Sequence, residues 1–129
     1  MTTRTPFVTG VDFVTVPTGN LEAAMEFYGT VLGLPCSARY ERVPGAEFET
    51  GNLTLALFDF QAVGRENHPN RNPIALHVED VEAARAELES RGISFHGDTL
   101  DSGVCHMAFF SDPDGNTLML HHRYAPRVG

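Results

Sequence analysis

The sequence predicts an α+β fold built from two copies of one βαβββ module. Two short patterns recur along the 129 residues, and the second occurrence lies 60 or 64 positions after the first: Leu21–Ala24 with Val81–Ala84, and Gly51–Asn52 with Gly115–Asn116. Each copy also runs through a strand-like segment, a helical segment and three further strand-like segments in the same order. Repetition at this period indicates one supersecondary unit used twice.

The first module begins with the β-rich run Val11–Val16. Asn20 suits the N-cap of the helix that follows, because its short side chain can accept a hydrogen bond from the first helical turn. Gly33 is a typical helix-ending residue, and Pro35 prevents continuation of the helix. Three more strands are predicted, at Cys36–Arg42, Ala46–Thr50 and Leu53–Asp59.

The second module repeats this order from the strand Ile74–Val78. Asp80 is the predicted N-cap of its helix, and Gly92 ends that helix. The run Asp112–Gly115 is a strong turn signal, since proline sets φ and glycine tolerates positive φ. The strands of this half are predicted near Ile93–Gly97, Val104–Ser111 and Thr117–His122.

The two modules are predicted to share one core. One module of this size buries little sheet surface by itself, so two modules need each other for stability. We therefore treat 1–129 as a single domain, with modules at 10–60 and 73–124 and a polar linker at 61–72.

The charge balance excludes several functions. The chain has 17 acidic residues against nine cations, all of them arginine, for a net charge of −8. Without lysine it can form no Schiff base and no P-loop contact to phosphate. The acidic balance also argues against a nucleic-acid partner. It is compatible with steering of a cationic ligand and with a role in solubility alone.

The chain shows no sign of export or of membrane insertion. Its first residues lack the apolar core of a signal peptide, and no apolar run approaches the roughly 20 residues of a membrane span. We expect a cytoplasmic protein without a membrane partner, in which Cys36 and Cys105 are free thiols.

Four stretches resemble the vicinal oxygen chelate superfamily, which includes glyoxalase I, bleomycin-resistance proteins and extradiol dioxygenases. They are Asn20–Tyr28, Val31–Pro35, His77–Ala84 and Phe110–Asn116. The resemblance implies a half-open eight-stranded barrel with helices outside, a ligand on the concave face of the sheets, and pairing of two chains into a homodimer. Many members of the family hold one divalent metal ion on that face.

The resemblance also implies where such a metal would be held, and this sequence carries no suitable ligand there. The family's positions fall on Phe13, Pro73, Met119 and near Leu55 or Ala56. None of these side chains binds a hard divalent ion. We therefore expect a protein that binds a small molecule in the concave cleft without a metal cofactor.

Strand alternation extends these positions to a predicted pocket lining, because residues i and i+2 share one face of a sheet. The lining is Phe13, Thr15, Ala75, His77, Met119 and His121. His77 and His121 are the candidate catalytic residues, as general acid or base. The alternative function is a metal-dependent lyase, isomerase or dioxygenase with a rearranged site around these two histidines, completed by Asp12 or Glu79.

Overall fold

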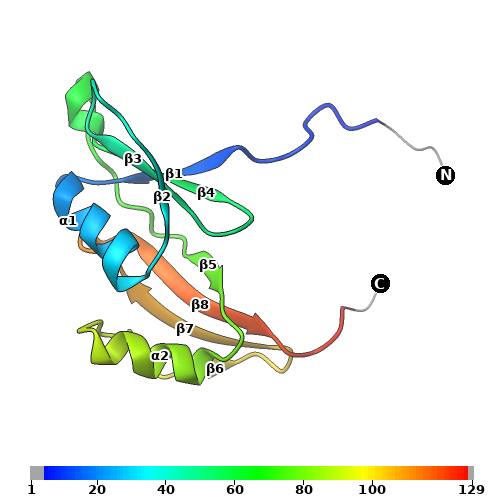
Figure 1. The fold of residues 1–129 in the computed structure, drawn as a ribbon. Coiled ribbons are helices and arrows are strands. Elements are labelled where there is room, and N and C mark those ends of the chain that lie inside the picture. The colour runs from blue at the N-terminus through cyan, green and yellow to red at the C-terminus, as the bar shows by residue number, and fades with distance from the viewer. Residues whose placement is uncertain (1–4, 128–129) are drawn as a thin grey trace.

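The computed structural model describes residues 5–127 and contains two four-stranded mixed sheets (Figure 1). The first sheet has the order β1-β4-β3-β2 and the second the order β5-β8-β7-β6. In each sheet the first strand of the module pairs in parallel with the last, and the other pairs are antiparallel. The strands are β1 Phe13–Pro17, β2 Cys36–Arg39, β3 Gly45–Glu49, β4 Thr54–Phe58, β5 Ile74–His77, β6 Leu100–Asp101, β7 Cys105–Ser111 and β8 Thr117–Arg123.

The predicted α+β fold of two βαβββ modules is confirmed. Among the described residues no strand pairing joins the two sheets into a closed barrel, so the half-open arrangement is confirmed as well. The linker contains a short 3-10 helix, η2 (Phe60–Val63), followed by irregular chain. No helix within residues 5–127 combines the length and apolarity that crossing a membrane requires. The cytoplasmic location stays a prediction.

Helix α1 (Leu21–Glu26) begins where the sequence predicts. The Asn20 side chain accepts a hydrogen bond from the backbone N–H of Ala23 at 3.1 Å. The helix then widens into a π-helical turn, η1 (Phe27–Val31), which the periodicity did not indicate. Gly33 adopts a positive φ of 75° and redirects the chain into β2.

Helix α2 (Val81–Ser90) is regular over its whole length. Asp80 accepts a hydrogen bond from the backbone N–H of Ala83 at 3.0 Å, so the second predicted N-cap is also confirmed.

The predicted strand at Ile93–Gly97 is wrong. His96 donates one backbone hydrogen bond to Phe109 at 2.8 Å, but Gly97 then takes a φ of +76° and turns the chain out of the extended conformation. Pairing with β7 resumes only in the two-residue strand β6. The other predicted strands are present with small shifts at their ends.

Both modules contribute to one hydrophobic core. Helix α1 packs on β3 and β4, whereas α2 packs on β7 and β8, so each helix covers one face of its own sheet. The two covered faces share a cluster that includes Val16, Leu57, Phe110 and Leu118. Phe27 of η1 approaches Phe110 of the other module, with ring centroids 6.3 Å apart. The opposite face of each sheet is left open.

A buried polar network also joins the modules at the turn after β7. The Tyr28 hydroxyl donates to Asp112 Oδ2 at 2.7 Å, and the Asn116 side-chain amide donates to the same oxygen and to the carbonyl of Pro17, each at 2.8 Å. Burial and the Asp112 carboxylate raise the pKa of Tyr28 far above its ordinary value. Tyr28 therefore stays protonated and keeps donating its hydrogen bond.

Candidate functional site

The open face of each sheet carries the residues that strand alternation predicts for it. Along β8, Leu118 and Leu120 are buried against α2, whereas Met119 and His121 are half-buried on the other face. Ala75 and His77 of β5 lie beside Met119 and His121 in register. On the other sheet, β1 places Phe13 and Thr15 beside Thr54 and Ala56 of β4.

Neither of two pockets within residues 5–127 contains all six predicted lining residues. Ala75 and His77 line a pocket between the modules. Thr15 lines a second pocket, together with Arg65 and Asn70 of the linker region. Phe13, Met119 and His121 line neither of these two pockets. The predicted lining residues therefore belong to two different sheets, and the two on β5, Ala75 and His77, line a pocket.

The pocket between the modules, called the inter-module pocket from here on, has a volume of about 620 Å³. It follows the edge of β5, and both faces of that strand contribute, with Leu76 on one side and Ala75 on the other. Further walls come from the segment after η1, the turn between β3 and β4, and the inner side of α2. Most of the lining is aliphatic: Val31, Leu32, Leu34, Leu53, Leu55, Ile74, Leu76, Val78, Ala84, Leu88 and Leu120.

A small number of polar groups border this apolar pocket. The Arg91 guanidinium donates to the Val31 carbonyl at 2.8 Å and to Glu87 Oε1 at 3.0 Å. These bonds link α2 to the first module across the pocket and pair one positive with one negative charge. His77 is the third ionisable residue of the lining, and two thirds of its side chain is exposed. The pocket suits an apolar ligand with few polar atoms.

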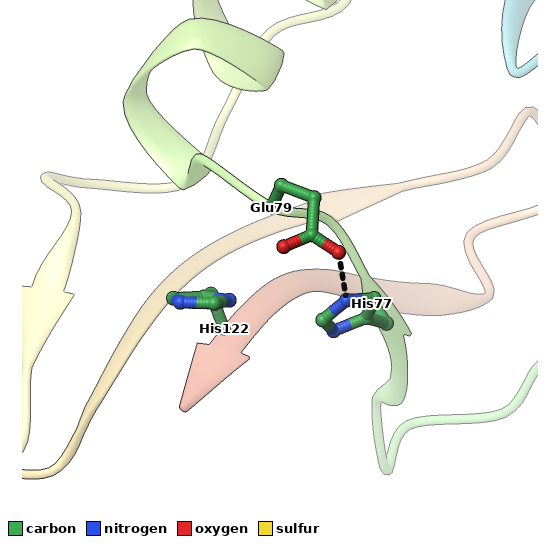
Figure 2. Close-up of side chains that lie close together, drawn as sticks. All are labelled: His77, Glu79 and His122. Atoms are coloured by element: carbon green, nitrogen blue, oxygen red, sulfur yellow. Dashed lines mark hydrogen bonds and ion pairs between the residues drawn. The ribbon is translucent and has the colours of Figure 1, made fainter. Parts of the chain in front are cut away.

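The structure brings His77 together with Glu79 and His122 (Figure 2). His77 Nε2 lies 3.0 Å from Glu79 Oε1, and the rings of His77 and His122 have centroids 5.8 Å apart. Sequence reasoning paired His77 with His121 and left His122 aside. His121 is the register partner of His77, but the ring of His77 lies close to that of His122, the next residue along β8. The His-x-Glu spacing beside two consecutive histidines is the signal that could have indicated this cluster.

Electrostatics keeps the carboxylate of this cluster ionised. The pKa of Glu79 is lowered, first by its hydrogen bond with His77, then by the charge of His77 and, more weakly, by that of His122. Glu79 is therefore a carboxylate near neutral pH and can accept hydrogen bonds or bind a cation.

Two other groups of histidine, hydroxyl and carboxylate side chains that contact one another lie outside the predicted site. His96 Nε2 is 2.8 Å from the Ser111 hydroxyl, and Asp101 accepts a hydrogen bond from Tyr124 while facing His106 at 3.4 Å. Neither group lines the inter-module pocket. Both cysteines are free, as predicted.

The family's usual metal positions do not fit a metal ion in this chain. Phe13, Pro73 and Met119 carry no ligand for a hard divalent ion, and Leu55 is fully buried in the core. No reaction step can therefore be assigned to a metal at these positions.

Two βαβββ modules with a shared core and open sheet faces define the class of fold, which does not by itself fix the function. The chain belongs to the Glyoxalase/Bleomycin resistance protein/Dioxygenase superfamily, whose family model matches residues 10–120. The resemblance seen in the sequence is thereby confirmed. Among curated proteins no match to this chain is found.

Solved structures share the fold over nearly the whole chain. TnmS3, an antibiotic binding protein from Streptomyces sp. CB03234, is 24% identical with a TM-score of 0.78, and the match covers 92% of this chain and 99% of that one. A putative glyoxalase family protein from Bacillus anthracis is 25% identical with a TM-score of 0.79, covering 93% and 99%. Lactoylglutathione lyase from Agrobacterium tumefaciens is 20% identical with a TM-score of 0.73, covering 88% and 93%.

Proposed function

We propose that this protein binds a small, largely apolar molecule in the inter-module pocket, and that it does so without the family's usual metal site. The observation that carries this proposal is the pocket itself. Its volume of about 620 Å³ lies within the range of roughly 300–1,000 Å³ that small-molecule sites occupy. Aliphatic walls with a few polar groups at the border are the usual composition of such sites.

The position of β5 connects this pocket to the cleft predicted from the sequence. Ala75 and His77 line the pocket, and their register partners on β8 are Met119 and His121, which lie on the open face of the sheet. A ligand seated in the pocket can therefore extend over the edge of β5 onto that face. There His121 is available as a hydrogen-bond partner.

The relatives support binding as the common property and leave the chemistry variable. TnmS3 is described as an antibiotic binding protein, whereas the protein from Agrobacterium tumefaciens is a lactoylglutathione lyase. Binding needs only the pocket, which this chain has. Metal chemistry of the family's kind needs ligands at positions where this chain has Phe13, Pro73 and Met119.

We further propose that two copies of the chain pair, as the sequence resemblance implies. The segment before β1 runs away from the sheets (Figure 1). Its apolar side chains are exposed: Phe7 completely, and Val8 and Val11 by more than two thirds. Exposed apolar residues in one extended segment favour association with another surface. The oligomeric state of the purified protein, measured by analytical ultracentrifugation, tests this part, and a monomer at high concentration would contradict it.

Binding is tested with a neutral, apolar fluorescent probe, Nile red, on the full chain. Ala84→Phe places a large ring at the α2 wall of the pocket and should weaken binding by about tenfold or more. The matched control is Ala86→Phe, which lies on the exposed side of the same helix and should bind as the wild type does. Thermal unfolding verifies that both variants fold. Equal binding by wild type and a folded Ala84→Phe variant would refute the pocket as the site.

A further inference from the structure

The geometry points to a binding site for one divalent transition-metal ion of the zinc, nickel or cobalt class, formed by His77, Glu79 and His122. This site lies at the end of β5 and β8, apart from the positions that hold metal in the family. It shares His77 with the proposed ligand pocket, whereas Glu79 and His122 do not line that pocket.

The distances fit one ion. Each of the three residues offers a ligand atom, and these atoms all lie within 4.8 Å of one another. In a tetrahedral site with bonds of about 2.0–2.2 Å, ligand atoms are roughly 3.3–3.5 Å apart. Shifts of about 1 Å therefore suffice to close the site. His77 and Glu79 can make such shifts, because their side chains are 66% and 89% exposed. Figure 2 shows the Glu79 carboxylate between the two rings.

The ligand chemistry selects the class of ion. Two imidazoles and one carboxylate form the His₂Glu set that is found in open zinc sites, where a fourth position is left for water or a ligand. Imidazole nitrogen favours zinc, nickel, cobalt and copper over magnesium and calcium. The site should therefore discriminate against magnesium, which a purely acidic surface cluster would not do.

The neighbouring contacts leave the three ligands available. Asp80 is occupied at the N-cap of α2, where it accepts from Ala83, so Glu79 is the carboxylate that faces the histidines. The Nδ1 atom of His122 is buried and has no hydrogen-bond partner within residues 5–127. A buried ring nitrogen without a partner is uncommon and unfavourable. The His122 ring is thus not committed to another protein group through that nitrogen.

A bound ion would also border the inter-module pocket. His77 lines that pocket, so an ion held by His77 would lie beside the pocket lining. If the proposed function holds, a ligand with an apolar body and one oxygen or nitrogen donor can use both features. This consequence rests on the proposed function, but the metal site itself does not.

Calorimetric titration of the full chain with Zn²⁺ and Mg²⁺, after removal of metal by a chelator, tests the site. We expect one zinc ion per chain and no comparable magnesium binding. His77→Ala, Glu79→Gln and His122→Ala should each weaken zinc binding by about tenfold or more. His121→Ala is the matched control, because it removes a neighbouring histidine outside the cluster and should leave zinc affinity unchanged.

Thermal unfolding with and without zinc shows whether each variant is folded. An ion that binds only the folded chain raises its melting temperature, and this shift should be present in His121→Ala and absent in the three cluster variants. The site is refuted if the wild type does not bind zinc, if one ion binds per two chains, or if the folded His122→Ala variant binds as tightly as the wild type. Nile red binding by Glu79→Gln and His122→Ala, which change no residue of the pocket lining, separates this outcome from a failure of the proposed function.

Discussion

The two modules have the same topology but carry different kinds of side chain. Module 10–60 contains no histidine, whereas five of the six histidines lie in module 73–124 and the sixth, His68, lies in the linker. The first module contributes the aromatic pair Phe27 and Tyr28, which reaches across the boundary into the shared core. Both copies of the repeat thus line the pocket, but only the second copy carries imidazole groups.

The helices show the same difference. In the first module α1 is short and passes into a π-helical turn, which brings Tyr28 to the buried Asp112 of the other module. In the second module α2 is longer, regular and has no aromatic side chain. π-Helical turns within helices often mark positions under functional or packing constraint. Here the constraint is the junction between the modules.

The largest expected effect comes from breaking the shared core. Phe110→Ala removes a fully buried ring that contacts Phe27 of the first module and Phe95 of its own. We expect a loss of about 3–5 kcal/mol in the free energy of unfolding, measured by urea denaturation. Because the core is shared, both modules should still unfold in one transition. Two separate transitions would contradict the shared core.

The buried network at the module junction should be next in size. Asp112→Ala leaves the Tyr28 hydroxyl and the Asn116 amide without their common acceptor, and it also removes the acceptor of two backbone N–H groups in the turn. We expect a loss of about 3 kcal/mol, since unpaired buried donors are costly. Asp98→Ala, at an exposed position, is the control and should change stability little. A loss below about 1 kcal/mol for Asp112→Ala would show that the network is replaceable.

The two helix caps allow a direct comparison of the modules. Asn20→Ala and Asp80→Ala each remove one hydrogen bond to the third residue of a helix, and each should cost about 1 kcal/mol. Asp80 also carries a charge that interacts favourably with the helix N-terminus, so its removal should cost slightly more at low salt. Chemical denaturation at two salt concentrations measures the difference. If both losses are equal at low and high salt, the charge of Asp80 contributes nothing.

The smallest expected effect concerns the pKa of Asp101, which forms an exposed hydrogen bond with Tyr124 in the second module. The pKa of Asp101 is lowered, first by the hydrogen bond from the Tyr124 hydroxyl and then by the backbone N–H of Gly103. A lowered folded-state pKa means that this stabilisation is present above the ordinary value of 3.8 and is lost as the pH falls through the lowered value. In an NMR titration, Tyr124→Phe should therefore raise the pKa of Asp101. An unchanged pKa would show that the hydrogen bond does not form in solution.

Local sequence signals predicted most of the fold. The caps Asn20 and Asp80, the glycine after α1 and the β-rich runs each act over a few residues, so they can be read without knowledge of the tertiary structure. The wrong strand at Ile93–Gly97 was predicted from the same kind of signal, which covers only a few residues. A run such as Ile93–His96, which alternates apolar and polar residues before a glycine, is compatible with a strand, but whether it pairs depends on how β7 lies beside it.

The candidate site was only partly predictable. Alternation predicts that Met119 and His121 share one face of β8, and both are less buried than Leu118 and Leu120 of the other face. It could not show that His77 meets His122 rather than its register partner His121, nor that the edge of β5 borders a pocket made largely of residues from other elements.

By itself, then, the sequence determined the repeat, the family and the helix starts, because these depend on residue identity and short-range spacing. Only the tertiary structure decided how the modules meet at Tyr28 and Asp112, where the pocket lies and which histidines gather around Glu79. These features depend on contacts between segments far apart in the chain, and the positions of such segments follow from the packing of the whole core.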